Sequence, residues 1–343
     1  MSSKTPKVTL LQRIQQPFGF RKTYNFTLYI ILCGALLGFS LSRLMYLSFD
    51  NIFCNPNSKV GSALPGECYY YKQRPGKIGI MLHLSTVLPA GILVVLQFLP
   101  VIRYKWLLVH RINGYIIIVL SVLSTVGVFI VLKFVLGGLV DVQTVPAFAS
   151  ILFLGSKGLA LWNIKKLQIE QHRAWMIRAW SVAGYIITMR IISLLMSLII
   201  SSTSRKPFSA IPCTVIDYIF AGNASQVLGS YPSCSPYYSG QNRDQHAIVQ
   251  ANMGTGRADQ LVAAFNSTFS TGSWLALAIH CIGAEVYLRL TPAEATRLRK
   301  ISYQKQLEAG VQNPGNGGLT VQRLGDAEPW DVPESEELTS PLR

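Results

Sequence analysis

Residues 112–134 read INGYIIIVLSVLSTVGVFIVLKF, with Lys133 near the end as the single charged side chain. A helix of about 20 apolar residues crosses the roughly 30 Å of hydrocarbon in a bilayer. The stretch therefore predicts a transmembrane helix. Other stretches of the chain also have the required length. We predict six spans, at residues 25–47, 78–99, 112–134, 145–163, 179–200 and 272–290.

The composition of the whole chain agrees with this reading. Half of the 343 residues are hydrophobic and 14% are charged, against about a quarter charged in a soluble domain. The first apolar stretch is too long for the core of a cleavable signal peptide and is expected to remain as a helix. The predicted fold is an all-α integral membrane bundle embedded in the lipid bilayer.

The basic residues give the orientation, because Lys and Arg gather beside spans on the cytoplasmic side. Segments 1–24, 103–111, 164–178 and 289–305 hold 17 of them, whereas the loops 48–77, 135–145 and 201–271 hold eight. Both termini are therefore predicted to be cytoplasmic. The net charge of +15 is divided among four short flanks, so it reflects topology, and we expect no nucleic-acid partner.

The cysteines and glycosylation motifs fit this map. Cys54 and Cys68 fall in one predicted lumenal loop and Cys213 and Cys234 in another, which suggests two disulfides in an oxidising compartment. The last loop also holds two Asn-x-Ser/Thr acceptors, at Asn223 and Asn266, and these motifs support its lumenal assignment.

Three regions are expected along the chain. Residues 1–24 form a basic cytoplasmic lead, and residues 25–290 form the membrane domain, with lumenal loops at 48–77 and 201–271. The second loop is either a lumenal cap or largely flexible. Residues 291–343 form a cytoplasmic tail that begins with a polar helix near Pro292. Its Gly-rich and acidic sequence predicts disorder from about residue 310.

Ionisable groups inside spans are costly and are therefore candidate functional residues. Glu285 is interpreted either as an acid held in a water-poor pocket, where burial raises the pKa of a carboxyl group, or as the partner of Lys157 in a structural ion pair. The other candidates for a catalytic role are His280, His83 and Arg190. No metal-site pattern is present in the sequence, and we expect no metal and no cofactor.

Two further groups lie at the predicted cytoplasmic edge, where His-Arg pairs open spans three and five. Helix N-termini favour anions, so these groups are candidates for binding a phosphate, a lipid headgroup or an acidic substrate. Ordinary anchoring at the membrane surface is the alternative. The residues are His110, Arg111, His172, Arg173, Trp175 and Arg178.

The same residues carry a resemblance to a known family. The run Leu88-Pro-Ala-Gly-Ile, then Gln97-Phe, then His110-Arg-Ile-Asn-Gly114, followed by His172-Arg-Ala-Trp-Met-Ile-Arg178 and Arg190, resembles the membrane proteins grouped as domain of unknown function 2306. The ending, with Trp274 to His280 and Glu285 to Glu294, together with Pro212-Cys213 and Tyr231-Pro-Ser-Cys234, looks like the fungal branch. The resemblance covers roughly residues 78–294, and the His172–Arg178 block is its most specific part.

The nearest functional resemblance is to membrane-bound terpene cyclases of meroterpenoid pathways. That resemblance implies acid-initiated cyclisation of a hydrophobic (epoxy)prenyl substrate, in the endoplasmic reticulum by default. Glu285 would donate or relay the proton, His280 and His83 would be second members, and aromatic residues such as Trp162, Trp175 and Tyr185 would line the pocket. Dry, apolar surroundings would protect the carbocations from water.

Two other functions stay open. A haem-binding electron carrier would use His110 and His172 as ligands, with His83 and His280 as a second pair. A non-enzymatic scaffold or a transporter is also compatible with few charges inside the membrane. The absence of a clear inverted repeat counts against the transporter.

Overall fold

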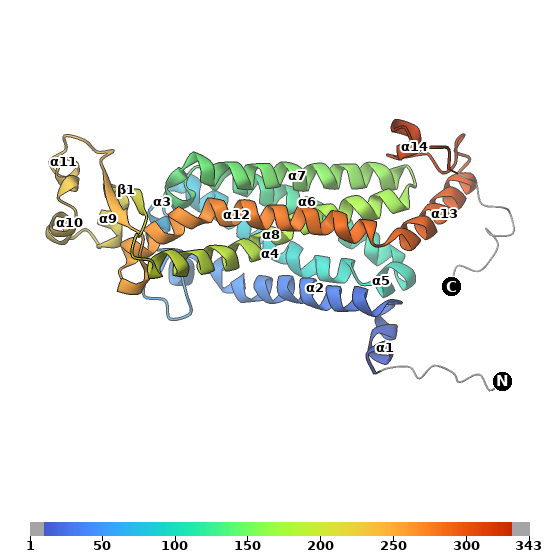
Figure 1. Cartoon of the computed structure of the whole chain (residues 1–343), viewed down its shortest axis with the longest axis horizontal. Coiled ribbons are helices and arrows are strands. Elements are labelled where there is room, and N and C mark those ends of the chain that lie inside the picture. Colours follow the sequence, from blue (N-terminus) through green and yellow to red (C-terminus); the bar gives the residue numbers. More distant parts are fainter. Residues whose placement is uncertain (1–9, 331–343) are drawn as a thin grey trace. The chain divides into compact units, whose positions relative to one another are not determined.

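The computed structural model describes residues 10–330, and the chain forms two compact units. Among the described residues, unit 1 contains residues 10–147 and 187–273, and unit 2 contains residues 148–186 and 274–330. Three long helices run through both units: α7 (Val140–Lys165), α8 (Ile169–Ser202) and α12 (Ala258–Arg289). Figure 1 shows the elements in sequence colours.

The remaining helices and strands each belong to one unit. Unit 1 has α1 (Leu10–Gln15), α2 (Thr23–Arg43), α3 (Glu67–Tyr71), α4 (Arg74–Gln97), α5 (Pro100–Lys105), α6 (Leu107–Val131), β1 (Phe208–Pro212), α9 (Cys213–Ile219), α10 (Ala224–Ser230), α11 (Ser235–Tyr238) and β2 (His246–Gln250). Unit 2 has α13 (Pro292–Glu308) and α14 (Val321–Leu324).

The predicted all-α membrane fold is confirmed. In the described residues, five helices are long and apolar enough to cross a membrane: α2 with its short extension to Leu47, α4, α6, α7 and α8. A sixth candidate is α12 together with α13, which is bent by 71° from it. Many large apolar side chains of these helices are exposed, among them Ile31, Val119 and Ile151, as expected of surfaces that face lipid.

Small residues allow the spans of unit 1 to pack closely. α4 contacts both α2 and α6. A side-chain carbon added at Gly127 of α6 would lie 2.6 Å from the backbone nitrogen of His83 on α4, and one added at Gly91 of α4 would lie 2.4 Å from the hydroxyl of Ser40 on α2. Small residues at such crossings bring helix backbones together and gain van der Waals contact.

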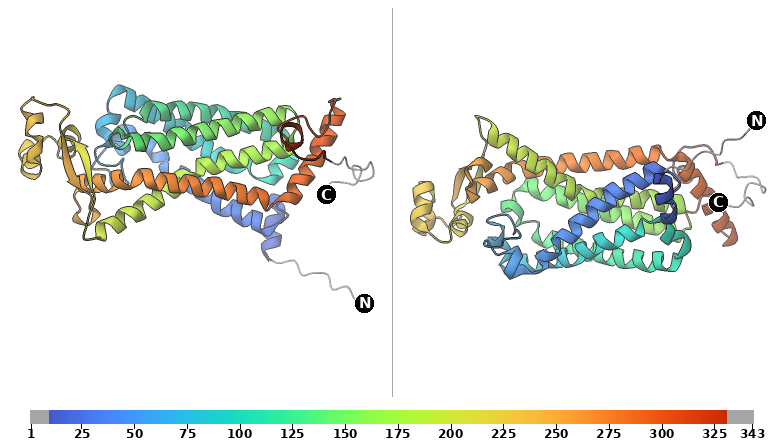
Figure 2. Two further views of the ribbon diagram at one scale, coloured as in Figure 1. Left: turned by 45° about the horizontal axis from the view of Figure 1, so that its top comes forward. Right: turned by 90° about the horizontal axis from the view of Figure 1, so that it is seen from below.

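Residues 201–271 form an ordered cap followed by the start of α12, and not a flexible loop. β1 and β2 pair antiparallel, with Ala210 opposite Ile248, and α9–α11 gather beside them (Figure 2). The cap has an apolar core that includes the fully buried Ile216, Val227 and Val249. A disulfide between Cys213 and Cys234 joins α9 to the segment before α11.

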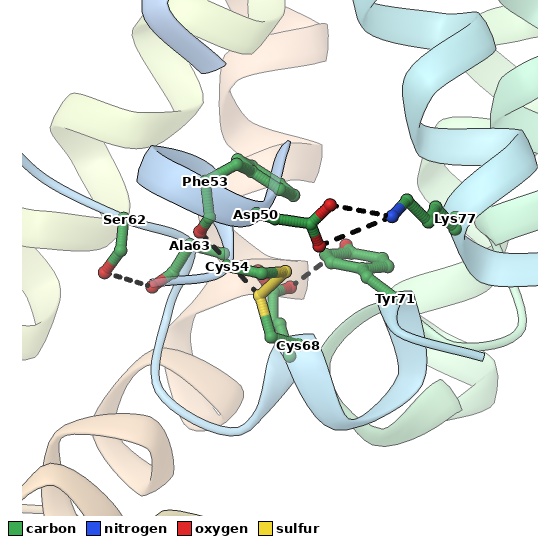
Figure 3. The surroundings of a disulfide bond; sticks show 9 residues. Asp50, Phe53, Cys54, Ser62, Ala63, Cys68, Tyr71 and Lys77 are labelled. Carbon is green, nitrogen blue, oxygen red and sulfur yellow. Dashed lines mark hydrogen bonds and ion pairs between the residues drawn. A yellow bond between two sulfur atoms is a disulfide. The ribbon is translucent and has the colours of Figure 1, made fainter. Parts of the chain in front are cut away.

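The second disulfide lies in the loop before α4. It joins Cys54 to Cys68, so both predicted pairs are confirmed. Figure 3 shows this bond beside the Asp50–Lys77 ion pair, which measures 3.1 Å, and beside Phe53 and Tyr71. The disulfide fixes α3 against the Phe49–Phe53 turn, and buried aromatic rings surround it.

In unit 2, the chain after α13 folds back onto the end of α7 and the short loop before α8. The Leu319 backbone N–H donates to Asn163 Oδ1 at 2.8 Å, and Gly315 N–H donates to Gln306 Oε1 at 2.7 Å. Gln306 also donates to the fully buried Gln168. The predicted disorder from about residue 310 is therefore wrong for residues 310–330, whereas residues 331–343 lie outside the described part.

Candidate functional site

In unit 1, the first His-Arg group joins the end of α4 to the start of α6. The side-chain amide of Gln97 donates to the His110 carbonyl oxygen at 3.0 Å, and Asn113 donates to Gln97 Oε1 at 2.9 Å. Asn113 also donates to the Leu93 carbonyl oxygen at 3.1 Å. Arg111 is exposed. The sequence Gln97…His110-Arg-Ile-Asn-Gly114 thus forms a polar joint between two helices.

In unit 2, the second His-Arg group also joins helices, because its side chains contact α7 and the end of α12. His172 Nδ1 lies 2.9 Å from the carbonyl oxygen of Ala160 on α7. Arg173 donates to the Tyr287 and Thr291 hydroxyls near the end of α12, at 3.3 Å each. The Arg178 guanidinium stacks on Trp175, 4.7 Å from its centroid. Arg173 and Arg178, which we predicted to bind an anion, therefore donate their hydrogen bonds to residues of α12 and to Thr291 just after it.

Glu285 does not have the buried environment expected of a proton donor. Its side chain is 49% exposed, and its two oxygens accept bonds from Arg178 at 2.6 and 3.0 Å. The proposed pairing with Lys157 is wrong, because the ion-pair partner of Glu285 is Arg178. Lys157 is buried, with its ammonium 4.0 Å from the Phe153 ring centroid and 4.3 Å from that of Trp180.

The other candidates of unit 2 are also placed in helix packing. The Ser181 hydroxyl donates to the His280 carbonyl oxygen at 2.8 Å. A side-chain carbon added at Gly184 of α8 would lie 3.0 Å from the His280 ring. Tyr185 is buried, whereas Trp162 is 38% exposed. The Ser181 and Gly184 contacts with His280 place α8 against α12, and Glu285 remains 49% exposed.

A different cluster forms in unit 1, around Arg190 of α8. The Arg190 guanidinium lies over the Phe39 ring of α2, 5.6 Å from its centroid, and Arg43 lies over the same ring at 5.4 Å. Glu67 and Tyr71 of α3 are within electrostatic range of Arg190. We call Arg43, Glu67, Tyr71 and Arg190 the outer cluster, because they lie toward the disulfide-bearing side of unit 1.

His83 is the remaining predicted catalytic residue. It also lies within electrostatic range of Arg190. Its Nδ1 is 2.9 Å from the Ser124 hydroxyl of α6. The structure therefore brings together two of the four predicted catalytic residues, His83 and Arg190, and it places Glu285 and His280 in the other unit.

Glu67 is the acidic member of the outer cluster. It opens α3 directly after Gly66, whose φ of +84° permits the turn into the helix. Burial raises the pKa of the Glu67 carboxyl to about 7, against the opposing effect of the Arg190 guanidinium. The Tyr71 hydroxyl makes a long hydrogen bond of 3.5 Å to Glu67 Oε1. This carboxyl therefore exchanges its proton near neutral pH.

A small cavity of about 20 Å³ adjoins Glu67 and is also lined by Tyr70, Leu136 and Asn266. Such a volume suffices for about one water molecule. Asn266 is 7% exposed, and its side-chain oxygen is buried and accepts no hydrogen bond from another described residue. Two polar residues, Glu67 and Asn266, are therefore part of the cavity lining.

Sequence reasoning missed Glu67 because the residue lies outside every predicted span, where a carboxyl is ordinarily solvated. The available signal was its position directly before Cys68, in Gly66-Glu-Cys-Tyr-Tyr-Tyr71. A disulfide at Cys68 holds the neighbouring carboxyl in place among aromatic rings. Among the described residues, no group of three or more His, Cys, Asp or Glu side chains is arranged to hold a metal ion.

Comparison with known proteins agrees with this architecture. Residues 80–221 match the family model described as "Predicted membrane protein (DUF2306)". A protein of Aspergillus versicolor, named Ava biosynthesis cluster protein G, is 22% identical over 347 aligned residues, which cover 86% of this chain and 97% of that protein. No solved structure matches the chain. The resemblance of this multi-pass membrane protein to the domain of unknown function 2306 family is thereby confirmed, and the similarity to a fungal protein named for a biosynthesis cluster is consistent with the fungal branch.

Proposed function

We propose that this chain is a membrane-bound terpene cyclase in which Glu67 supplies the proton that starts the reaction. The observation that carries the proposal is the placement of the Glu67 carboxyl beside the Tyr71 hydroxyl and a small cavity, where burial raises its pKa to about 7. A general acid works best when its pKa lies near the working pH. The similarity to a protein named for a biosynthesis cluster supports a role in secondary metabolism.

The proposed reaction is an isomerisation. The Glu67 proton passes to the epoxide oxygen of an epoxyprenyl chain, and the epoxide C–O bond breaks. The π electrons of a neighbouring alkene then form the new C–C bond. Loss of a proton from the last carbocation restores the balance, and the Glu67 carboxylate takes up a proton in turn. The product therefore has the atomic composition of the substrate.

The surroundings of Glu67 suit cationic intermediates. Phe49, Phe53 and Tyr71 are buried on the same side of unit 1, and the Phe53 and Tyr71 rings are 5.7 Å apart between centroids. The faces of aromatic rings attract cations, and few water molecules fit near buried rings. The Cys54–Cys68 disulfide holds these rings and Glu67 in one fixed arrangement.

The test uses microsomes that contain the full-length chain and an epoxyprenyl substrate. We expect cyclised product from the natural protein and at least a 100-fold loss with Glu67→Gln. Glu67→Asp is expected to retain part of the activity. Glu285→Gln is the matched control and should keep the activity, because Glu285 is exposed and paired with Arg178. Immunoblotting verifies equal accumulation of each variant.

Two results would overturn the proposal. One is full activity of Glu67→Gln together with loss of activity in Glu285→Gln, which would restore the acid expected from the sequence. The other is a strong near-violet Soret band in the purified protein without any cyclisation, which would favour the haem-binding electron carrier. We place the reaction in the endoplasmic reticulum membrane, and fractionation with a marker of that organelle tests this location.

A further inference from the structure

We propose that Arg43 and Arg190 together bind the anionic head of an amphiphile, a phosphate or carboxylate group joined to an apolar chain. The site depends on the placement of the two arginines beside one ring and does not require the cyclisation. Within the proposed function, the bound head would direct the apolar chain of the substrate toward Glu67.

The depth of the two arginines suits such a ligand. Arg43 is the last residue of α2, which begins at Thr23. Twenty residues at about 1.5 Å each span roughly 30 Å, which is the thickness of the hydrocarbon region. Arg43 therefore reaches the membrane boundary opposite the start of α2. Arg190 lies at the same level, because both guanidiniums contact the Phe39 ring.

Both arginines have donors to spare. A guanidinium carries five N–H donors. Arg43 makes one hydrogen bond, from Nη1 to the Tyr46 hydroxyl at 3.3 Å, and Arg190 makes none to another residue in the described part of the chain. Arg178, by contrast, uses two donors on Glu285. Arg190 is exposed as a residue at the surface of unit 1.

The charge of the cluster also calls for an anion. The Arg190 guanidinium lies within electrostatic range of one carboxyl, Glu67, which holds its proton for part of the time near neutrality, and Arg43 lies within electrostatic range of Arg190. The positive charge of the two arginines therefore exceeds the negative charge that Glu67 supplies. Phosphate and carboxylate groups match the forked geometry of a guanidinium. An anion between Arg43 and Arg190 would relieve their mutual repulsion.

Exposed apolar side chains extend from the arginines along the membrane-facing surface. Beside Arg190, the neighbouring Ile191 is 56% exposed. On α2, Leu41 is 50% exposed close to Arg43. An apolar chain attached to the bound head would lie against these side chains and remain within the hydrocarbon.

Binding is measured with the full-length protein in phosphatidylcholine nanodiscs. The probes are radiolabelled lysophosphatidate and oleate, with monoolein as the neutral probe and inorganic phosphate as a competitor. We expect both anionic probes to bind at least tenfold more tightly than monoolein. Arg43→Gln and Arg190→Gln should each weaken this binding by about 10- to 100-fold, the loss expected for hydrogen bonds to charged groups.

The matched control is Arg205→Gln, an exposed arginine of the cap region, which should bind the probes as the natural protein does. Glu67→Gln should also retain binding, so that failure of the cyclase proposal is distinguishable from failure of this one. Equal binding of monoolein, or unchanged binding in both the Arg43 and the Arg190 variants, would overturn the proposal.

Two further arms identify the source of the anion. In nanodiscs that contain phosphatidylglycerol, loss of probe binding shows that a bilayer headgroup occupies the site, whereas unchanged binding shows a dedicated amphiphile. Competition by inorganic phosphate shows that the head is recognised without its chain. Each of these results requires the arginine pair and supports the site.

Discussion

At the scale of single residues, the functional interpretation depends on where each carboxyl lies. The sequence directed attention to Glu285, because it falls within an apolar stretch, but its oxygens are taken by Arg178. Glu67 falls within a polar loop, yet the folded chain surrounds it with Tyr71, Arg190 and a small cavity. The position of a residue along the chain predicts its depth in the membrane. Whether water reaches its side chain depends on which distant residues pack around it.

The raised pKa of Glu67 implies a pH-dependent stability. In the unfolded chain this carboxyl loses its proton near pH 4.5, and in the folded chain near pH 7. Between these values the folded state binds more protons than the unfolded state, so the free energy of unfolding falls as the pH rises. The stabilising contribution is complete below about pH 4.5 and is lost as the pH passes about 7.

Thermal unfolding in detergent at pH 5 and pH 8 measures this effect. We expect the midpoint of the natural protein to fall between these pH values by more than that of Glu67→Gln, which has no proton to lose. Equal pH dependence of the two proteins would show that the Glu67 carboxyl is not buried in the folded state.

At the scale of helices, the most specific sequence blocks act as joints. Gln97, His110 and Asn113 connect α4 with α6, and Arg173 and Arg178 connect α8 with α12. The spans themselves were predictable, because apolar length is a local property. The joints were not, since they depend on which helices become neighbours. The order of residues 310–330 was not predictable for the same reason, because their partners Asn163 and Gln168 are more than 140 residues away in the sequence.

The Arg178–Glu285 pair can be measured by a double-mutant cycle. We expect Arg178→Gln and Glu285→Gln each to lower stability, and the double change to lower it by less than the sum. The coupling should be about 0.5–1 kcal/mol, because the pair is partly exposed. Lys157→Met combined with Glu285→Gln is expected to be additive. Coupling in the second cycle and none in the first would restore the ion pair predicted from sequence.

Close packing of α4 on α6 gives a second test at this scale. Gly127→Ala places a methyl group 2.6 Å from a backbone nitrogen of α4, so we expect a loss of about 1–3 kcal/mol in the free energy of unfolding. Gly34→Ala on α2 is the control, because nothing lies within 4 Å of the added carbon. Chemical denaturation in detergent compares them. Equal stabilities would contradict the close crossing.

At the scale of the whole chain, the question is which side of the membrane holds the cap and the two disulfides. The distribution of basic residues predicts the lumenal side, and the disulfides agree with an oxidising compartment. The two glycosylation candidates differ in their exposure. Asn223 is exposed at the start of α10, whereas Asn266 is 7% exposed within α12.

We therefore expect one glycan, at Asn223. Endoglycosidase treatment should shift the natural protein on a gel, and Asn223→Gln should abolish the shift. Asn266→Gln should leave the shift unchanged, because a buried side chain inside a helix does not reach the glycosyltransferase in the folded protein. A glycan at Asn266 would show that this part of α12 is open when modification occurs, and modification at neither position would argue against a lumenal cap.

The most direct test of the account is an infrared titration of Glu67 in the intact protein. The difference spectrum between the natural protein and Glu67→Gln isolates the C=O stretch of this protonated carboxyl, recorded in nanodiscs from pH 4 to pH 9. The expected result is a band that persists at pH 6 and disappears with a midpoint close to 7. A midpoint near 4.5, the ordinary value for a solvated glutamate, would contradict the account and leave the proposed cyclase without its acid.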